Sequence, residues 1–144
     1  MSRNLFLSIV TVILLVVIGC GSGEKSAAPY GGKPLKLAVI PKGTSHEFWK
    51  SVHFGAEKAA KELGNVEIVW RGPVVESDTG SQIEVVKNMI TLGVDGIVLA
   101  PNQKGGLVDA VEESIDESIP VVIFDSGLDE GPKIAGYVAT DNFK

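Results

Sequence analysis

Short apolar runs recur along this chain at intervals of about thirty residues, and the stretches between them have the periodicity of amphipathic helices. The runs occupy residues 35–40, 66–70, 96–99 and 120–124. Regular alternation of strand and helix favours a parallel sheet, because each parallel connection needs a long crossover. We therefore predict an α/β fold, a doubly wound parallel sheet in three αβα layers. A fifth strand is predicted over residues 134–139, after the turn-rich residues 126–132.

The composition of each apolar run predicts where its strand lies in the sheet. Residues 96–99 and 120–124 are continuously apolar. This is typical of central parallel strands that are buried on both faces. In residues 66–70, Glu67 and Val69 alternate with three apolar residues, which indicates a strand nearer the edge.

Capping boxes predict the starts of the first two helices. Thr44 and Glu47 have the required spacing, and so have Thr79 and Gln82. In such a box the hydroxyl accepts a hydrogen bond from a backbone N–H, and the longer side chain reaches back. The first helix is therefore expected to begin at Thr44 and the second at Thr79.

Glycines predict the ends of the same two helices. Gly64 and Gly93 each follow the last apolar residue of a helical pattern. A third helix carries Leu107, Val111 and Ile115 at intervals of four. The three predicted helices fill the gaps between the first four apolar runs.

Two aromatic residues, Phe48 and Trp49, stand side by side in the first turn of the first helix. The apolar stripe that continues through Val52 and Ala56 assigns Phe48 to the sheet. Trp49 lies about 100° further round the helix and could offer a flat apolar surface to a ring-shaped ligand. The alternative is that Trp49 only covers the edge of the sheet.

A ligand crevice in an open parallel sheet lies beyond the carboxyl ends of the strands. Asp125 directly follows the fourth apolar run and could accept hydrogen bonds from two neighbouring hydroxyls. Alternatively, it opens the following turn by bonding its own backbone. His46 lies at the junction of the loop after the first run with the first helix, where it could donate to a ligand or simply be solvated.

The N-terminus has the pattern of a secretory signal peptide. Arg3 precedes fourteen apolar residues, 5–18, which are too few for a comfortable membrane span. Residues 17–20 resemble a bacterial lipobox, in which the cysteine receives a diacylglycerol after residues 1–19 are removed. Cys20 is the only cysteine of the chain. Two alternatives stay open, a cleaved signal with an incidental cysteine and an uncleaved short anchor.

Residues 20–34 are predicted to be a lipidated cysteine followed by a flexible tether rich in Gly, Ser, Ala and Pro. Fully extended, residues 21–34 would reach roughly 45–50 Å. Residues 35–144 then form the globular part. The net charge of −5 offers no basic patch for nucleic acid, so no nucleic-acid partner is expected.

Sequence motifs of catalysis are missing from the chain. It contains no GxSxG, HExxH, CxxC or GxGxxG, so no nucleophile, metal site or dinucleotide cofactor is proposed. A flavodoxin-like or receiver-like domain would share the fold, but the loop after the first run lacks a phosphate cradle and paired acids. We expect a non-catalytic protein without a cofactor or metal.

Six segments together resemble the type I periplasmic sugar-binding proteins, the ribose- and galactose-binding group. They are residues 37–50, 55–60, Gln82, 93–99, 119–125 and 139–142. The resemblance covers everything from residue 35 onward. It implies a ligand site at His46, Phe48, Trp49, Asp125 and Ser126, and a hinge at Asp141 and Asn142.

The same resemblance implies a function and a location. It implies an extracytoplasmic solute-binding lipoprotein that holds a sugar or similar polar ligand for the permease of an ABC transporter. Such a protein works in the periplasm or at the cell surface, anchored to the membrane through Cys20. The alternatives are a lipid-anchored sensory or interaction module with a sugar-binding-like lobe, and a non-functional truncated product.

Two departures from the family limit this transfer. His46 stands where sugar binders often carry Asn or Asp, and Ser126 stands where ribose binders carry Arg, so the resemblance does not fix the sugar. The family also folds into two lobes that close over the ligand. Residues 35–144 match the N-terminal lobe alone, so the second lobe is expected to be absent.

Overall fold

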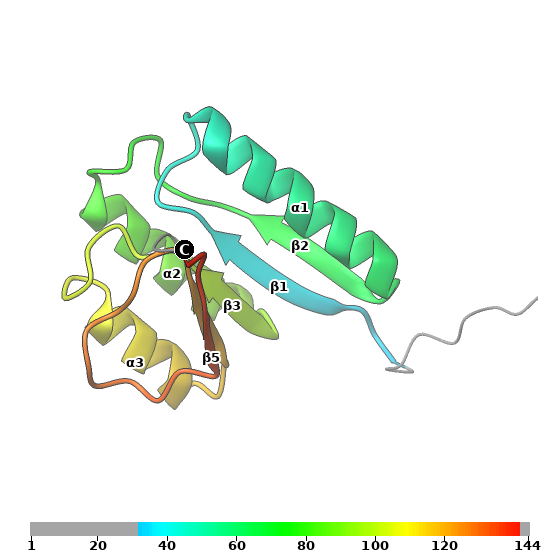
Figure 1. The fold of residues 1–144 in the computed structure, drawn as a ribbon. Coiled ribbons are helices and arrows are strands. Elements are labelled where there is room, and N and C mark those ends of the chain that lie inside the picture. The colour runs from blue at the N-terminus through cyan, green and yellow to red at the C-terminus, as the bar shows by residue number, and fades with distance from the viewer. Residues whose placement is uncertain (1–31, 142–144) are drawn as a thin grey trace, which may run out of the picture.

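Five parallel strands form one sheet in the computed structural model, which describes residues 32–141. The strands are β1 (Leu35–Ile40), β2 (Val66–Trp70), β3 (Gly96–Leu99), β4 (Val121–Phe124) and β5 (Gly136–Val138), in the order β2-β1-β3-β4-β5. The helices are α1 (Glu47–Leu63), α2 (Thr79–Leu92) and α3 (Val108–Asp116). Helix α1 lies on one face of the sheet, and α2 and α3 lie on the other (Figure 1). The predicted doubly wound fold in three layers is confirmed.

Strand β1 lies between β2 and β3 in the sheet. It pairs in parallel with β2 on one side, where Leu35 lies opposite Val66, and with β3 on the other, where Ile40 lies opposite Leu99. The strand order therefore reverses between β1 and β3. Strand β2 lies at one edge, as its alternating pattern predicted.

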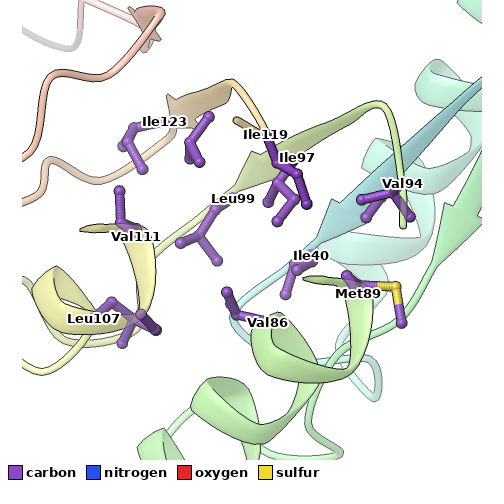
Figure 2. Close-up of a cluster of buried hydrophobic side chains, with 13 residues drawn as sticks. Ile40, Val86, Met89, Val94, Ile97, Leu99, Leu107, Val111, Ile119 and Ile123 are labelled. Atoms are coloured by element: carbon purple, nitrogen blue, oxygen red, sulfur yellow. The ribbon is translucent and has the colours of Figure 1, made fainter. Parts of the chain in front are cut away.

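The main hydrophobic core lies between the sheet and the α2–α3 layer. The strands contribute fully buried side chains such as Ile40, Leu99 and Ile123. Figure 2 shows them facing Val86 of α2 and Val111 of α3. Burial of these branched apolar side chains, at about 1.5–3 kcal/mol each, holds this half of the fold together.

The opposite face of the sheet is covered only in part. The expectation that β3 and β4 are buried on both faces is wrong, because Val98, Val122 and Phe124 are only half-buried. The reason is that α1 packs against β2, at one end of the sheet. An apolar groove of about 350 Å³ lies between α1 and the sheet, and Leu37 of β1 and Val138 of β5 are among its lining residues.

Helix α1 begins later than its capping box predicts. Its N-cap is His46, whose Nδ1 accepts a hydrogen bond from the backbone N–H of Phe48 at 3.1 Å. Thr44 instead donates its hydroxyl to the carbonyl of Pro73 at 3.2 Å. Its backbone N–H donates to the same oxygen at 2.9 Å. These contacts with the loop after β2 keep Thr44 outside the helix.

The second capping box is also displaced. The N-cap of α2 is Asp78, whose carboxylate accepts from the backbone N–H of Ser81 at 2.9 Å and from its hydroxyl at 2.6 Å. These hydrogen bonds from Ser81 hold the pKa of Asp78 below its ordinary value. Thr79 is the first helical residue. Gln82 is fully buried instead of reaching back to cap the helix.

The predicted ends of α1 and α2 and the predicted third helix are confirmed. Gly64 and Gly93 are left-handed, with φ of 74° and 67°, a conformation that favours glycine over residues with a Cβ. Helix α3 starts directly after Leu107, and both Leu107 and Val111 are fully buried.

The fifth strand is shorter than predicted, because only residues 136–138 pair with β4. Ile134 still belongs to a turn, since its N–H donates to the carbonyl of Pro132 at 3.0 Å. Strand β5 forms the second edge of the sheet. Its side chains Tyr137 and Val138 are 54% and 64% exposed.

The two aromatic residues of α1 exchange their predicted roles. Trp49 is 2% exposed and Phe48 is 51% exposed, so the prediction that Phe48 faces the sheet is wrong. The indole N–H of Trp49 donates to Oε1 of Glu76 at 2.7 Å. Its ring packs edge-on against Phe124, with centroids 6.2 Å apart. The larger ring is buried because it finds both an apolar neighbour and an acceptor for its one polar atom.

Replacing Leu99 with alanine tests the position of the core. Leu99 is fully buried in β3, so Leu99→Ala should lower the free energy of unfolding by about 2–5 kcal/mol. Leu92→Ala is the matched control, because Leu92 is 52% exposed at the end of α2. That change should stay within about 0.5 kcal/mol. Urea denaturation measures both, and equal losses would contradict the described core.

Tryptophan fluorescence tests the reversal of Phe48 and Trp49. The chain has two tryptophans, so Trp70→Phe leaves Trp49 as the single emitter. We expect emission at short wavelength and weak quenching by iodide, because Trp49 is buried. The control, Trp49→Phe, leaves the half-buried Trp70, which should be quenched more strongly. Stronger quenching of Trp49 than of Trp70 would restore the sequence-based assignment.

Candidate functional site

Three polar side chains meet beyond the carboxyl ends of β1 and β4. The Nζ of Lys42 lies 2.7 Å from Oδ2 of Asp125 and also donates a hydrogen bond to the hydroxyl of Ser126. That hydroxyl donates to Oδ2 of Asp125 at 3.1 Å. Side-chain exposures of 21% for Lys42 and 32% for Asp125 leave the ion pair open to solvent on one side. We call these three residues the polar cluster.

The backbone of Asp125 explains how its carboxylate reaches Lys42. Asp125 has a φ of 63°, in the left-handed region that Asp and Asn tolerate better than most residues. Its N–H donates to the carbonyl of Val138 at 2.9 Å, which ties the end of β4 to β5. Asp125 therefore does open the following turn, but through its dihedral angle, while its side chain joins the polar cluster.

An apolar pocket of about 280 Å³ adjoins the polar cluster. Its lining residues are Phe48, Val52, Phe124, Asp125, Val138, Ala139 and Thr140. Phe48 and Phe124 supply the aromatic rings of this pocket. An apolar surface with a few hydrogen-bonding groups at one side is the usual composition of a site for a small ligand.

Trp49 lies behind the pocket and is not among the residues that line it. Its ring meets Phe48 edge-on, with centroids 4.9 Å apart, and meets Phe124 in the same manner. The prediction that Trp49 presents its ring to the crevice is therefore wrong for this structure. Trp49 instead supports the two aromatic residues that do line the pocket.

His46 is exposed at the start of α1, two positions before Phe48. Because its Nδ1 accepts the N–H of Phe48, the neutral ring carries its hydrogen on Nε2. His46 is not among the residues that line the pocket, so its ligand role stays a prediction. Of the five predicted site residues, Phe48 and Asp125 line the pocket, Ser126 belongs to the polar cluster, and Trp49 packs against Phe48.

Lys42 is the site residue that the sequence reasoning missed. A signal for it was present, since Lys42 lies two positions after the last residue of β1, among the residues that follow the strands. The carboxyl ends of parallel strands lie on the same side of the sheet, so a lysine after β1 can form an ion pair with Asp125 after β4. Of the predicted hinge, Asp141 is exposed, and Asn142 lies outside the described residues.

The predicted signal peptide, Cys20 and most of the tether also lie outside the described residues. Within residues 32–141, no helix has the length and apolar character needed to cross a membrane. The same part of the chain contains no group of three or more His, Cys, Asp or Glu side chains that could hold a metal ion.

The sequence profile of the periplasmic binding protein domain matches residues 37–144. Among characterised relatives, the D-ribose/D-allose-binding protein of Pseudomonas aeruginosa is 34% identical over 138 residues. The match covers 90% of this chain and 43% of the relative. The ribose import binding protein of Bacillus subtilis is 26% identical over 140 residues, 94% of this chain and 45% of the relative. The chain thus spans less than half the length of these relatives.

Solved structures agree with these sequence matches. An ABC transporter solute-binding protein of Agrobacterium vitis with bound D-fucose is 37% identical, with a TM-score of 0.71 over 74% of this chain and 38% of that one. A periplasmic solute-binding protein of Actinobacillus succinogenes with bound D-allose is 31% identical, with a TM-score of 0.70 over 77% of this chain and 40% of that one.

All four of these proteins are described as binding proteins, which agrees with the expectation of a non-catalytic protein. The profile covers the whole described sheet from the third residue of β1 onward. The predicted resemblance is confirmed, and the chain belongs to the periplasmic binding protein family.

Proposed function

We propose that this chain is the sugar-binding part of an extracytoplasmic solute-binding protein that serves an ABC transporter. The observation that carries the proposal is the polar cluster next to the apolar pocket that Phe48 lines. A sugar has hydroxyls that need donors and acceptors, and it has apolar faces that pack well on aromatic rings. The relatives named above, which are described as binding ribose, allose or fucose, support the same class of ligand.

Each member of the polar cluster has a distinct role in this proposal. The carboxylate of Asp125 accepts hydrogen bonds from ligand hydroxyls, which are stronger than those between neutral groups. Lys42 has three N–H donors, and its contacts with Asp125 and Ser126 leave one for a ligand oxygen. Because Lys42 also compensates the charge of Asp125, the cluster suits a neutral ligand better than a charged one.

Phe48 provides the apolar surface on which the ligand ring packs. It is half exposed at the pocket, and its neighbour Trp49 holds it from behind. His46 adds a donor at the start of α1. In this proposal the described residues form one wall of the ligand crevice, and the hinge at Asp141 and Asn142 leads toward a second wall.

Sugar binding by the chain and by two variants tests this proposal. With one wall of the crevice, we expect weak binding of at least one sugar among D-ribose, D-allose and D-fucose, measured by saturation-transfer NMR. Asp125→Ala should weaken it at least tenfold, since a hydrogen bond to a charged group contributes about 1.5–3 kcal/mol. Asp116→Ala, an exposed change at the end of α3, is the control.

Two results would contradict the proposal. One is the absence of a saturation-transfer signal from every sugar tested with the wild-type chain. The other is an affinity of Asp125→Ala equal to that of Asp116→Ala, with both variants folded.

We further propose that the protein is exported and anchored through lipid on Cys20, after removal of residues 1–19. The basic start, the apolar run of residues 5–18 and the single cysteine at its end support this. The relative from Escherichia coli described as a D-allose-binding periplasmic protein supports export. The anchor would hold the binding domain near the permease, at the end of a tether of roughly 45–50 Å.

Labelling with a fatty acid tests the anchor. In bacteria fed radioactive palmitate, the wild-type protein should carry label and sediment with membranes. Cys20→Ser should lose the label, because it lacks the thiol that accepts the diacylglycerol. Ser22→Ala, two residues further on, should behave as wild type. Equal label in Cys20→Ser would exclude this anchor.

A further inference from the structure

Gln82 occupies an unusual place for a polar side chain, fully buried in the first turn of α2 near the carboxyl ends of β1 and β3. Its Nε2 donates to the carbonyl of Pro41 and to the carbonyl of Ala100, each at 2.9 Å. Its Oε1 accepts the backbone N–H of Asn102 at 2.9 Å. Both amide hydrogens and the amide oxygen are therefore used, all on backbone groups of the segments that follow β1 and β3.

Gln82 lies just beyond the last backbone hydrogen bond between β1 and β3. The last ladder bond at this end runs from the N–H of Ala100 to the carbonyl of Ile40, at 2.9 Å. Pro41 and Pro101 follow these two residues directly in the chain. A buried carbonyl without a donor would be costly, and Gln82 supplies donors to two of them.

These hydrogen bonds also fix the direction of the chain where the site begins. The carbonyl of Pro41 belongs to the same planar peptide unit as the N–H of Lys42, so holding this oxygen orients the backbone that carries Lys42. The bond to Asn102 does the same for the segment after β3. The carboxamide of Asn102 is buried without a hydrogen-bond partner among the described residues. The backbone N–H of Asn102, in contrast, has Gln82 as its partner.

We propose that Gln82 is a positioning residue for the ligand site. By bonding the segments after β1 and β3 at once, it sets their separation and presents Lys42 to Asp125 and Ser126. Gln82 itself is fully buried and touches no ligand in this proposal. The inference rests on the proposed function for its biological meaning, but its structural content is testable without a ligand.

The test compares Gln82→Met with Val86→Ala by amide NMR of the full chain in a mild detergent. Methionine keeps the length of the side chain and removes its donors and its acceptor. Val86 lies four positions later on α2, fully buried in the core, so Val86→Ala disturbs packing without touching these loops. In Gln82→Met, the amide of Asn102 should exchange with solvent about tenfold faster or more, as loss of one net hydrogen bond predicts.

The second readout is the polar cluster itself. The amide signals of Lys42, Asp125 and Ser126 should shift in Gln82→Met and stay close to wild type in Val86→Ala. If Gln82 only stabilised the fold, Gln82→Met would lower the melting temperature, as Val86→Ala does, and would leave these three signals in place. That result would overturn the inference. Equal shifts in the two variants would overturn it as well.

Two further results complete the test. If Gln82→Met does not fold, the wild-type amide of Asn102 decides, because exchange as fast as that of the exposed neighbour Gln103 would show that the Gln82 bond is not maintained. Sugar titration of the wild-type chain is kept as a separate arm. Failure of that arm contradicts the proposed function, while the amide signals still support or overturn the role of Gln82.

Discussion

Parallel pairing of β1 with both β2 and β3 is the constraint on which the rest of this structure depends. Because all five strands run in one direction, their carboxyl ends lie on the same side of the sheet, and every loop that follows a strand begins there. Lys42 and Phe48 follow β1, whereas Asp125 follows β4, and the three still lie beside one pocket or one cluster. Beyond the last backbone bond between β1 and β3, buried Gln82 donates to the carbonyls of Pro41 and Ala100.

Features set by local sequence were predicted well. The first four apolar runs became strands at nearly the expected residues, and Gly64 and Gly93 end their helices as left-handed caps. Helix starts were predicted less well, because caps compete with tertiary partners. Thr44 donates to the carbonyl of Pro73, which belongs to the loop after β2, and His46 takes the N-cap position of α1 instead. Periodicity alone contains no information about such a competitor.

The sequence predicted that the candidate residues follow strands, but it did not predict the contacts among them. Asp125 and Ser126 follow from their position after a strand and from the family resemblance. Lys42 was missed because its partner Ser126 lies 84 positions away, a pairing that depends on the order of the strands. Phe48 and Trp49 were reversed because the helical stripe ignores Glu76, which accepts the indole N–H and allows the larger ring to be buried.

The unequal covering of the two faces has a thermodynamic consequence. Apolar groups in the groove between α1 and the sheet are hydrated while the protein is folded, so unfolding adds less newly exposed apolar surface than it would for a sheet covered on both faces. Heat capacity increases with the apolar area exposed on unfolding. The described domain should therefore have a smaller heat-capacity change per residue, and a flatter dependence of stability on temperature, than a fully covered α/β domain of its size.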